Sequence, residues 1–184
     1  MTAPVTRATK ADLYTFPGKA ELIAGRIVEL MATGRRPNRV AGRIYRQLDD
    51  HATATGVGEA YTDNMGFTVP VLPSGRESFS PDASYYDGPF PADDMEFIEG
   101  APKFAVEVRS ANDYGNSAEE DLSEKREDYF QAGTLVVWDV DPRAELIRCY
   151  RSASVAPREF HRGDVADAEP AVPGWRMKVD DVFV

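Results

Sequence analysis

The sequence predicts an α/β (α+β) fold, in which helices flank a mixed central β-sheet and extra β-hairpins stand at both ends of the chain. Apolar segments occur in the order helix, three strands, helix, strand. The helix between the third and fourth strands implies a crossover connection, which is typical of parallel strands. Short apolar pieces before and after this core predict the additional β-hairpins.

The length and composition are those of one globular domain. The chain has 184 residues, of which 42% are hydrophobic and 28% are charged. A chain of this length can bury a core without disulfides. The sequence contains no internal repeat and no low-complexity linker. We therefore expect a single domain over residues 1–184.

Cysteine content and hydropathy indicate the compartment. The single cysteine, Cys149, excludes an internal disulfide and is typical of a reducing interior. The chain has no apolar run long enough to cross a bilayer, and the N-terminus lacks the apolar stretch of a secretory signal. We expect a cytoplasmic protein with no membrane partner.

The net charge of −10 restricts binding to nucleic acid, because Lys and Arg supply the contacts to phosphates. DNA binding would be weak, confined to a local basic patch or assisted by metal ions. One such patch comprises Arg35, Arg36, Arg39, Arg43 and Arg46. It is either a solvated helix face or an element that faces DNA.

Two core helices are predicted, over residues 37–54 and 117–132. Every fourth residue of the first is apolar, namely Val40, Ile44, Leu48 and Ala52. Pro37 is typical of its first turn and Gly56 of its end. In the second helix, Ser117 lies three residues before Glu120, which is the spacing of a capping box.

The strands are shorter and are separated by turns. Two apolar runs about Ala24-Gly25, within residues 21–31, predict a hairpin or a bent strand. Further strands are expected within residues 59–70, 81–88, 103–110 and 134–151, with a turn at 141–144 and a last apolar piece within 172–184. The segment 88–102 is rich in proline and glycine and predicts a loop.

Two carboxylates on neighbouring strands suit a hard cation. Asp82 begins the second core strand directly after Pro81, and Glu107 lies within the third. Adjacent strands would place both carboxylates at one end of the sheet. Mg²⁺ prefers oxygen ligands and is often held by one or two carboxylates. Alternatively, Asp82 is a turn residue beside proline and Glu107 is an exposed strand position.

Lys125 lies on the apolar face of the second core helix. This face comprises Ala118, Leu122, Lys125, Tyr129 and Ala132. Because the lysine interrupts the apolar face, its ammonium group either snorkels to water or is directed at buried carboxylates. In the second case, Asp82 and Glu107 are the expected partners.

The segments with these residues follow one another in a characteristic order. They are Pro81-Asp82, the strand end Glu107-Val108-Arg109-Ser110, Lys125 with Tyr129 and Ala132-Gly133, and Trp138-Asp139-Val140-Asp141-Pro142, flanked by ELIAGRIVEL and VPGWRMKVDDVF. In order and spacing they resemble the Uma2 family, a branch of the PD-(D/E)XK, restriction-endonuclease-like superfamily. The resemblance covers nearly the whole chain.

The resemblance implies a restriction-endonuclease-like core and metal-dependent hydrolysis of phosphodiester bonds. By position, Asp82 and Glu107 would bind Mg²⁺ or Mn²⁺. The superfamily usually has a lysine two residues after the glutamate, where this chain has Arg109, which cannot act as a base. Lys125 matches a variant whose lysine has moved to the following helix. It would orient the attacking water, and Arg109 would face the anionic substrate.

The predicted function is therefore a metal-dependent endodeoxyribonuclease with Asp82, Glu107 and Lys125 as catalytic residues, acting on DNA as a homodimer. One alternative is a catalytically silent binding or interaction module that kept the fold. Arg109 favours this alternative, as does Pro37-Asn38, which stands where many relatives have histidine. Another alternative is a hydrolase of a different phosphate ester.

Two further carboxylates remain open. Glu29 lies in the N-terminal hairpin and is a candidate to approach the site. Asp139 lies in the last core strand and has no assigned role.

Overall fold

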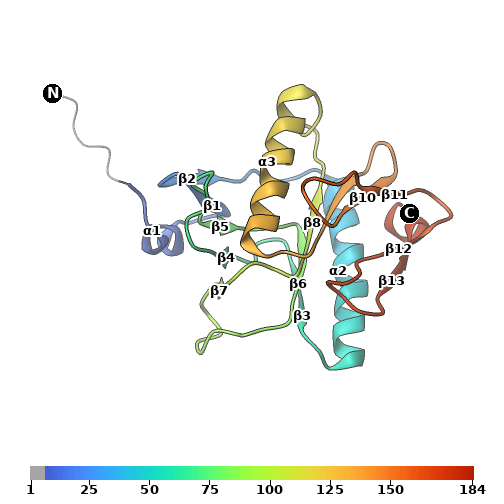
Figure 1. Cartoon of the computed structure of the whole chain (residues 1–184), viewed down its shortest axis with the longest axis horizontal. Coiled ribbons are helices and arrows are strands. Elements are labelled where there is room, and N and C mark those ends of the chain that lie inside the picture. Colours follow the sequence, from blue (N-terminus) through green and yellow to red (C-terminus); the bar gives the residue numbers. More distant parts are fainter. Residues whose placement is uncertain (1–6) are drawn as a thin grey trace.

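A six-stranded sheet forms the centre of the computed structural model, which describes residues 7–184 (Figure 1). In spatial order its strands are β11 (Arg158–Phe160), β10 (Leu146–Tyr150), β9 (Val136–Asp141), β8 (Phe104–Val108), β6 (Ala83–Tyr86) and β3 (Glu59–Thr62). β8 and β9 pair in parallel, and the other pairs are antiparallel. The mixed sheet predicted from the crossover helix is therefore confirmed.

Two long helices pack on opposite faces of this sheet. The helices are α1 (Lys10–Thr15), α2 (Arg35–Thr55), α3 (Asn116–Ala132) and α4 (Val179–Val182). Val106 of β8 belongs to one hydrophobic cluster with Ile44 of α2. Its neighbour Ala105, which points to the other face, belongs to a second cluster with Tyr129 of α3. Alternation along β8 thus directs one set of side chains to α2 and the other to α3.

Both core helices lie where the sequence predicts them, but their starts differ. α2 begins two residues before Pro37. The capping box predicted at Ser117 and Glu120 is wrong, because α3 already starts at Asn116 and is preceded by Gly115 without a side-chain cap. Gly115 has φ 104°, which glycine adopts far more readily than other residues. This backbone conformation starts the helix earlier and leaves Ser117 inside the first turn.

Smaller β units surround the central sheet. They are the hairpin of β1 (Ala20–Ile23) and β2 (Arg26–Glu29), the three-stranded sheet of β5 (Ser78–Phe79), β4 (Phe67–Thr68) and β7 (Ile98–Glu99), and the pair of β12 (Val165–Asp167) and β13 (Arg176–Lys178). The expected β-hairpins at both ends are thus present. The segment predicted as loop contains one short strand, β7, which pairs with β4.

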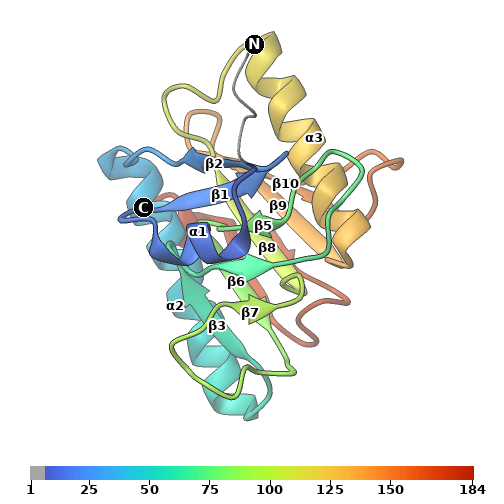
Figure 2. The ribbon, with the colours of Figure 1, turned by 90° about the vertical axis from the view of Figure 1, so that its left-hand side faces the viewer.

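The β1–β2 hairpin lies over the α3 side of the central sheet, and Figure 2 shows it in front of the sheet, beside α1. The amide of Leu22 in β1 donates to Ser78 Oγ at 2.7 Å, and the amide of Glu77 donates to the carbonyl of Leu22 at 2.8 Å. These two hydrogen bonds hold β1 against residues 77 and 78, so that side chains next to Leu22 can reach the α3 face of the central sheet.

Two expectations concern the environment of the chain. In the described part of the sequence, no helix combines the length and the apolar character needed to cross a membrane. The expected lack of a secretory signal rests partly on residues 1–6, which lie outside the described residues.

Candidate active site

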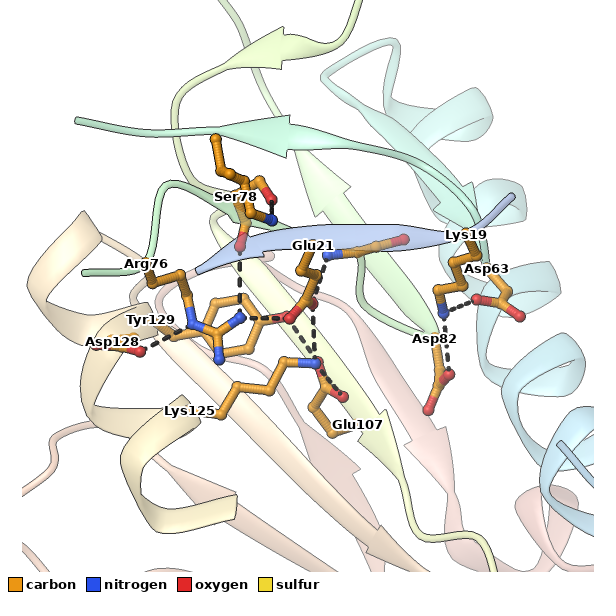
Figure 3. A network of polar contacts seen from close by, with 12 residues as sticks. Lys19, Glu21, Asp63, Arg76, Ser78, Asp82, Glu107, Lys125, Asp128 and Tyr129 are labelled. Carbon is orange, nitrogen blue, oxygen red and sulfur yellow. Dashed lines mark hydrogen bonds and ion pairs between the residues drawn. The ribbon is translucent and has the colours of Figure 1, made fainter. Parts of the chain in front are cut away.

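Glu107 and Lys125 meet on the α3 face of the central sheet. Lys125 Nζ lies 2.9 Å from Glu107 Oε1 and donates to Oε2 at 3.0 Å (Figure 3). The hydroxyl of Tyr129, one turn further along α3, donates to Glu107 Oε1 at 2.6 Å. Each side chain of the ion pair is only 16% exposed. Lys125 therefore does not snorkel to water, and its ammonium group points at a carboxylate of the sheet.

Glu21 of β1 is the second ion-pair partner of Lys125, where the sequence predicted Asp82, and sequence reasoning missed it. Its Oε1 lies 3.2 Å from Lys125 Nζ and accepts the amide hydrogen of Ser80 at 3.0 Å. The available signal was its first position in the ELIAGRIVEL motif, inside an apolar strand. Glu29, the carboxylate proposed from the hairpin, instead lies exposed at the end of β2.

Arg76 extends this network away from the sheet. It forms an ion pair with Glu21 Oε2 and donates from Nε to Asp128 Oδ2 at 2.8 Å. Asp128 of α3 is 4% exposed. The positive charge of Arg76 neutralises this buried carboxylate.

The network fixes the charge of Lys125. Burial by itself would lower the pKa of Lys125, but the negative charges of Glu107 and Glu21 outweigh burial and raise that pKa. Burial would likewise raise the pKa of Glu21, yet Lys125 and Arg76 lower it overall. Lys125 therefore remains an ammonium group at neutral pH and cannot serve as a general base.

Asp82 is hydrogen-bonded to β8, the strand that contains Glu107. Its amide donates to the carbonyl of Val106 at 3.0 Å, and its Oδ2 accepts the amide hydrogen of Val108 at 2.7 Å. The two bonds place its carboxylate beside the end of β8. The side chain remains 23% exposed, so solvent reaches this part of the site.

The charge of Asp82 is poorly balanced. Burial, followed by the negative charge of Glu107, raises the pKa of Asp82 to about 7. Lys19 opposes this shift, with its Nζ 3.8 Å from Asp82 Oδ1, but Lys19 also forms an ion pair with Asp63. Asp82 and Glu107 are thus close enough to repel each other.

This donor set fits a divalent cation. Asp82 and Glu107 offer carboxylate oxygens, which Mg²⁺ and Mn²⁺ prefer, and a cation between them would relieve their repulsion. Across residues 7–184, no group of three or more His, Cys, Asp or Glu side chains is arranged to hold a metal ion. An ion would therefore take two protein carboxylates and complete its coordination with oxygens of water or substrate, as Mg²⁺ often does.

The sequence suggested that Arg109 faces the anionic substrate, but its side chain is buried in ion pairs with other residues of the protein. Its side chain is 7% exposed, and it donates to Asp139 Oδ1 at 2.7 Å and Oδ2 at 2.5 Å. Its Nη2 also lies 2.8 Å from Glu119 of α3. Nε and Nη2 of the guanidinium group are engaged within the protein, and this ion pair gives a structural role to Asp139, whose role the sequence left open. At the position where the superfamily usually has its lysine, this chain therefore has an arginine that forms a structural ion pair with Asp139.

The mixed sheet between two helices, with carboxylates at one strand end, defines a restriction-endonuclease-like α/β protein. A crystal structure of "a putative nuclease belonging to DUF820" from Anabaena variabilis has this fold, with a TM-score of 0.72 over 98% of both chains and 16% sequence identity. The Uma2 family, described as "Putative restriction endonuclease", matches residues 11–180. This chain belongs to the Uma2 family, as its motifs predicted. No curated protein matches the sequence.

Proposed function

We propose that this protein is an endonuclease that hydrolyses DNA phosphodiester bonds with the help of a bound Mg²⁺ or Mn²⁺. The family and the fold support a nuclease role. The observation that carries the finer proposal is the grouping of Asp82 and Glu107 at the end of β8, with Lys125 held against Glu107. Two carboxylates and one fixed ammonium group are the parts that metal-assisted phosphodiester hydrolysis requires.

Asp82 and Glu107 would hold the cation. When bound, the ion supplies Lewis acidity to the phosphoryl oxygen and lowers the pKa of water. Glu107 is oriented for this task by the hydroxyl of Tyr129, and Asp82 by the amide of Val108. Both carboxylates are partly exposed, so substrate can approach them from solvent.

Lys125 would stabilise negative charge that develops on the phosphate and orient the attacking water. Its raised pKa keeps it protonated, so it acts as a hydrogen-bond donor and a fixed charge. Glu21 holds the ammonium group from the side opposite Glu107, which keeps it in place as charge changes at the site. We propose Glu21 as a positioning residue.

The second candidate function is a catalytically silent binding or interaction module. One observation favours it: Lys125 and Tyr129 already contact both oxygens of Glu107, so this carboxylate is satisfied without a cation. The raised pKa of Asp82 favours the nuclease over the silent module. A second carboxylate that repels Glu107 would help to bind a cation, whereas a binding module has no use for this repulsion.

Cleavage assays with supercoiled, linear and single-stranded DNA test the proposal. We expect cleavage with Mg²⁺ or Mn²⁺ by the native protein, and its loss in Asp82→Asn, Glu107→Gln and Lys125→Met. Glu29→Gln is the matched control, because it removes an exposed carboxylate outside the site. Cleavage that survives all three substitutions would place the activity elsewhere. No cleavage by the native protein would favour the silent module.

We also propose a cytoplasmic homodimer, because two sites would let both strands of a duplex be cut in one binding event. Light scattering at micromolar concentration should give twice the mass of 20.3 kDa expected for one chain. A monomer under these conditions would contradict this assembly, without affecting the proposal for a single site.

A further inference from the structure

A pocket of about 420 Å³ lies at the start of α2, where four arginines surround it. Its lining comprises Arg35, Arg36, Arg39, Val40, Arg43, Phe183 and Val184. We call it the arginine pocket. It gathers four of the five arginines of the basic patch, and Arg46 lies outside it. The patch is therefore more than a uniformly solvated helix face.

The charges of the arginine pocket are placed where a helix tolerates them least. The N-terminus of a helix carries partial positive charge and usually attracts Asp or Glu into its first turn. The first turn of α2 contains no acidic residue and instead holds Arg35 and Arg36. Gly34 precedes it and provides no side-chain cap, so backbone N–H groups of the first turn are left to other acceptors.

These arginines have few anionic partners in residues 7–184. Arg36 forms an ion pair with Glu145 at 2.5 Å, and Arg43 donates to the carbonyl of Val182 at 3.1 Å. No ion pair of Arg35 or Arg39 occurs within this range. Burial, and then the charges of Arg39, Arg46 and Arg35, lower the pKa of Arg43.

The scarcity of partners is notable because the chain is acidic. It has 31 Asp and Glu residues against 21 Lys and Arg. Positive charges that converge on a pocket, where only Arg36 has a carboxylate partner, favour the binding of an external anion.

The arginine pocket lies at the same end of the sheet as Asp82. α2 leads through a short turn into β3, which runs back toward Thr62, and Thr62 pairs with Ala83, the residue after Asp82. The start of α2 and the end of β8 are both in the upper part of Figure 1. The arginine pocket and the candidate active site are on opposite faces of the central sheet, toward the same end of its strands.

We propose that the arginine pocket binds a phosphate group through its guanidinium groups. Bidentate arginine contacts suit phosphate oxygens. The pocket has room for a phosphate together with the sugar attached to it. Assigning this phosphate to the DNA strand that is cut at Asp82 and Glu107 rests on the proposed function. Phosphate binding itself does not depend on cleavage.

The test compares Arg35→Gln/Arg39→Gln with Arg46→Gln, a matched loss of charge on the same helix outside the pocket. Both exchanged positions of the pocket are exposed, so the fold should be retained, and circular dichroism checks this. The probes are inorganic phosphate followed by NMR, and a DNA duplex, with 5′-phosphate or 5′-hydroxyl ends, titrated without divalent metal. We expect about a tenfold loss of phosphate affinity in the double variant and none in Arg46→Gln.

For DNA, we expect the slope of log K against log salt to fall by about two in the double variant, and by no more than about one in Arg46→Gln. Preference for 5′-phosphate ends would assign the pocket to a terminal phosphate, and equal binding would assign it to a backbone phosphate. Lost phosphate binding with unchanged DNA binding would support the site but overturn its role toward DNA.

Unchanged affinity for both probes in the double variant would overturn the proposal. Because neither titration involves cleavage, this result is separate from a failure of the nuclease assay. A protein that binds phosphate in the pocket but cuts no DNA would keep this inference and lose the proposed function.

Discussion

Glu107 and Asp139 are neighbours in register on the parallel strands β8 and β9, yet their surroundings differ. Asp139 is 1% exposed, and Arg109 takes both of its oxygens. Glu107 is 16% exposed and lies beside Asp82, whose negative charge is poorly balanced. The comparison teaches that a carboxylate buried in a complete ion pair, such as Asp139, has a structural role. A surplus carboxylate that solvent can reach indicates a site.

The largest expected effect is on cleavage. Glu107→Gln should lower the rate of DNA nicking about a thousandfold, which corresponds to ~4 kcal/mol of transition-state stabilisation, because a cation ligand is lost. Asp139→Asn should leave the rate per folded molecule nearly unchanged. Initial rates, normalised to the folded fraction measured by circular dichroism, make the comparison. Equal losses in both variants would erase the distinction between the two carboxylates.

Stability should respond in the opposite order. Asp139→Asn removes the buried partner of Arg109 and leaves it only the exposed carboxylate of Glu119, which should reduce the free energy of unfolding by about 3 kcal/mol. Glu107→Gln should cost only about 1 kcal/mol, because Glu21 still neutralises Lys125. Urea unfolding measures both. The matched control is the double variant Arg109→Met/Asp139→Leu, which removes both charges and should recover most of the loss. If the double variant recovers no stability, the Arg109–Asp139 pair must stabilise the fold beyond neutralising its own two charges.

Asp82 should make stability depend on pH. Its pKa in the fold, about 7, exceeds its ordinary value of 3.8, so the fold favours the protonated form. The stabilisation from this group is full below pH 4 and is lost as pH rises through 7. Asp82→Asn should therefore match the native protein at low pH and exceed its unfolding free energy by about 1–2 kcal/mol at pH 8.

Unfolding in urea at pH 5, 6, 7 and 8, without divalent metal, measures this difference. Glu29→Gln serves as the control and should show no such trend. A native protein that gains stability relative to Asp82→Asn as pH rises would reverse the sign and contradict the raised pKa.

The smallest expected effect concerns Lys19. Its positive charge lowers the pKa of Asp82, so Lys19→Gln should raise that pKa further. The rising limb of the pH–rate profile should move to higher pH by the same amount, while the rate at its plateau changes little. A large drop at the plateau would instead indicate that Lys19 contacts the substrate.

Local patterns in the sequence predicted the two core helices and the mixed sheet. The four-residue repeat of α2 and the apolar face of α3 place both helices, because each pattern reflects packing against one sheet face. The crossover through α3 implies the parallel pair of β8 and β9. The start of α3 was not predictable in this way, since a glycine conformation decided it.

The site was predictable only in part. Lys125 was visible because it interrupts an apolar face, and Glu107 because it interrupts an apolar strand. Glu21 was missed because its contact with Arg76 spans 55 residues, and no local period encodes it. Arg109 was misread for the same reason, since its partner Asp139 lies 30 residues later on the next strand.

Calorimetric titration with Mn²⁺ at pH 8 tests the central claim, that Asp82 and Glu107 together form a cation site, most directly. The native protein and Glu29→Gln should each bind one ion, and Asp82→Asn and Glu107→Gln should bind none at the same concentrations. Undiminished binding of Mn²⁺ by both site variants would show that these two carboxylates do not hold the metal.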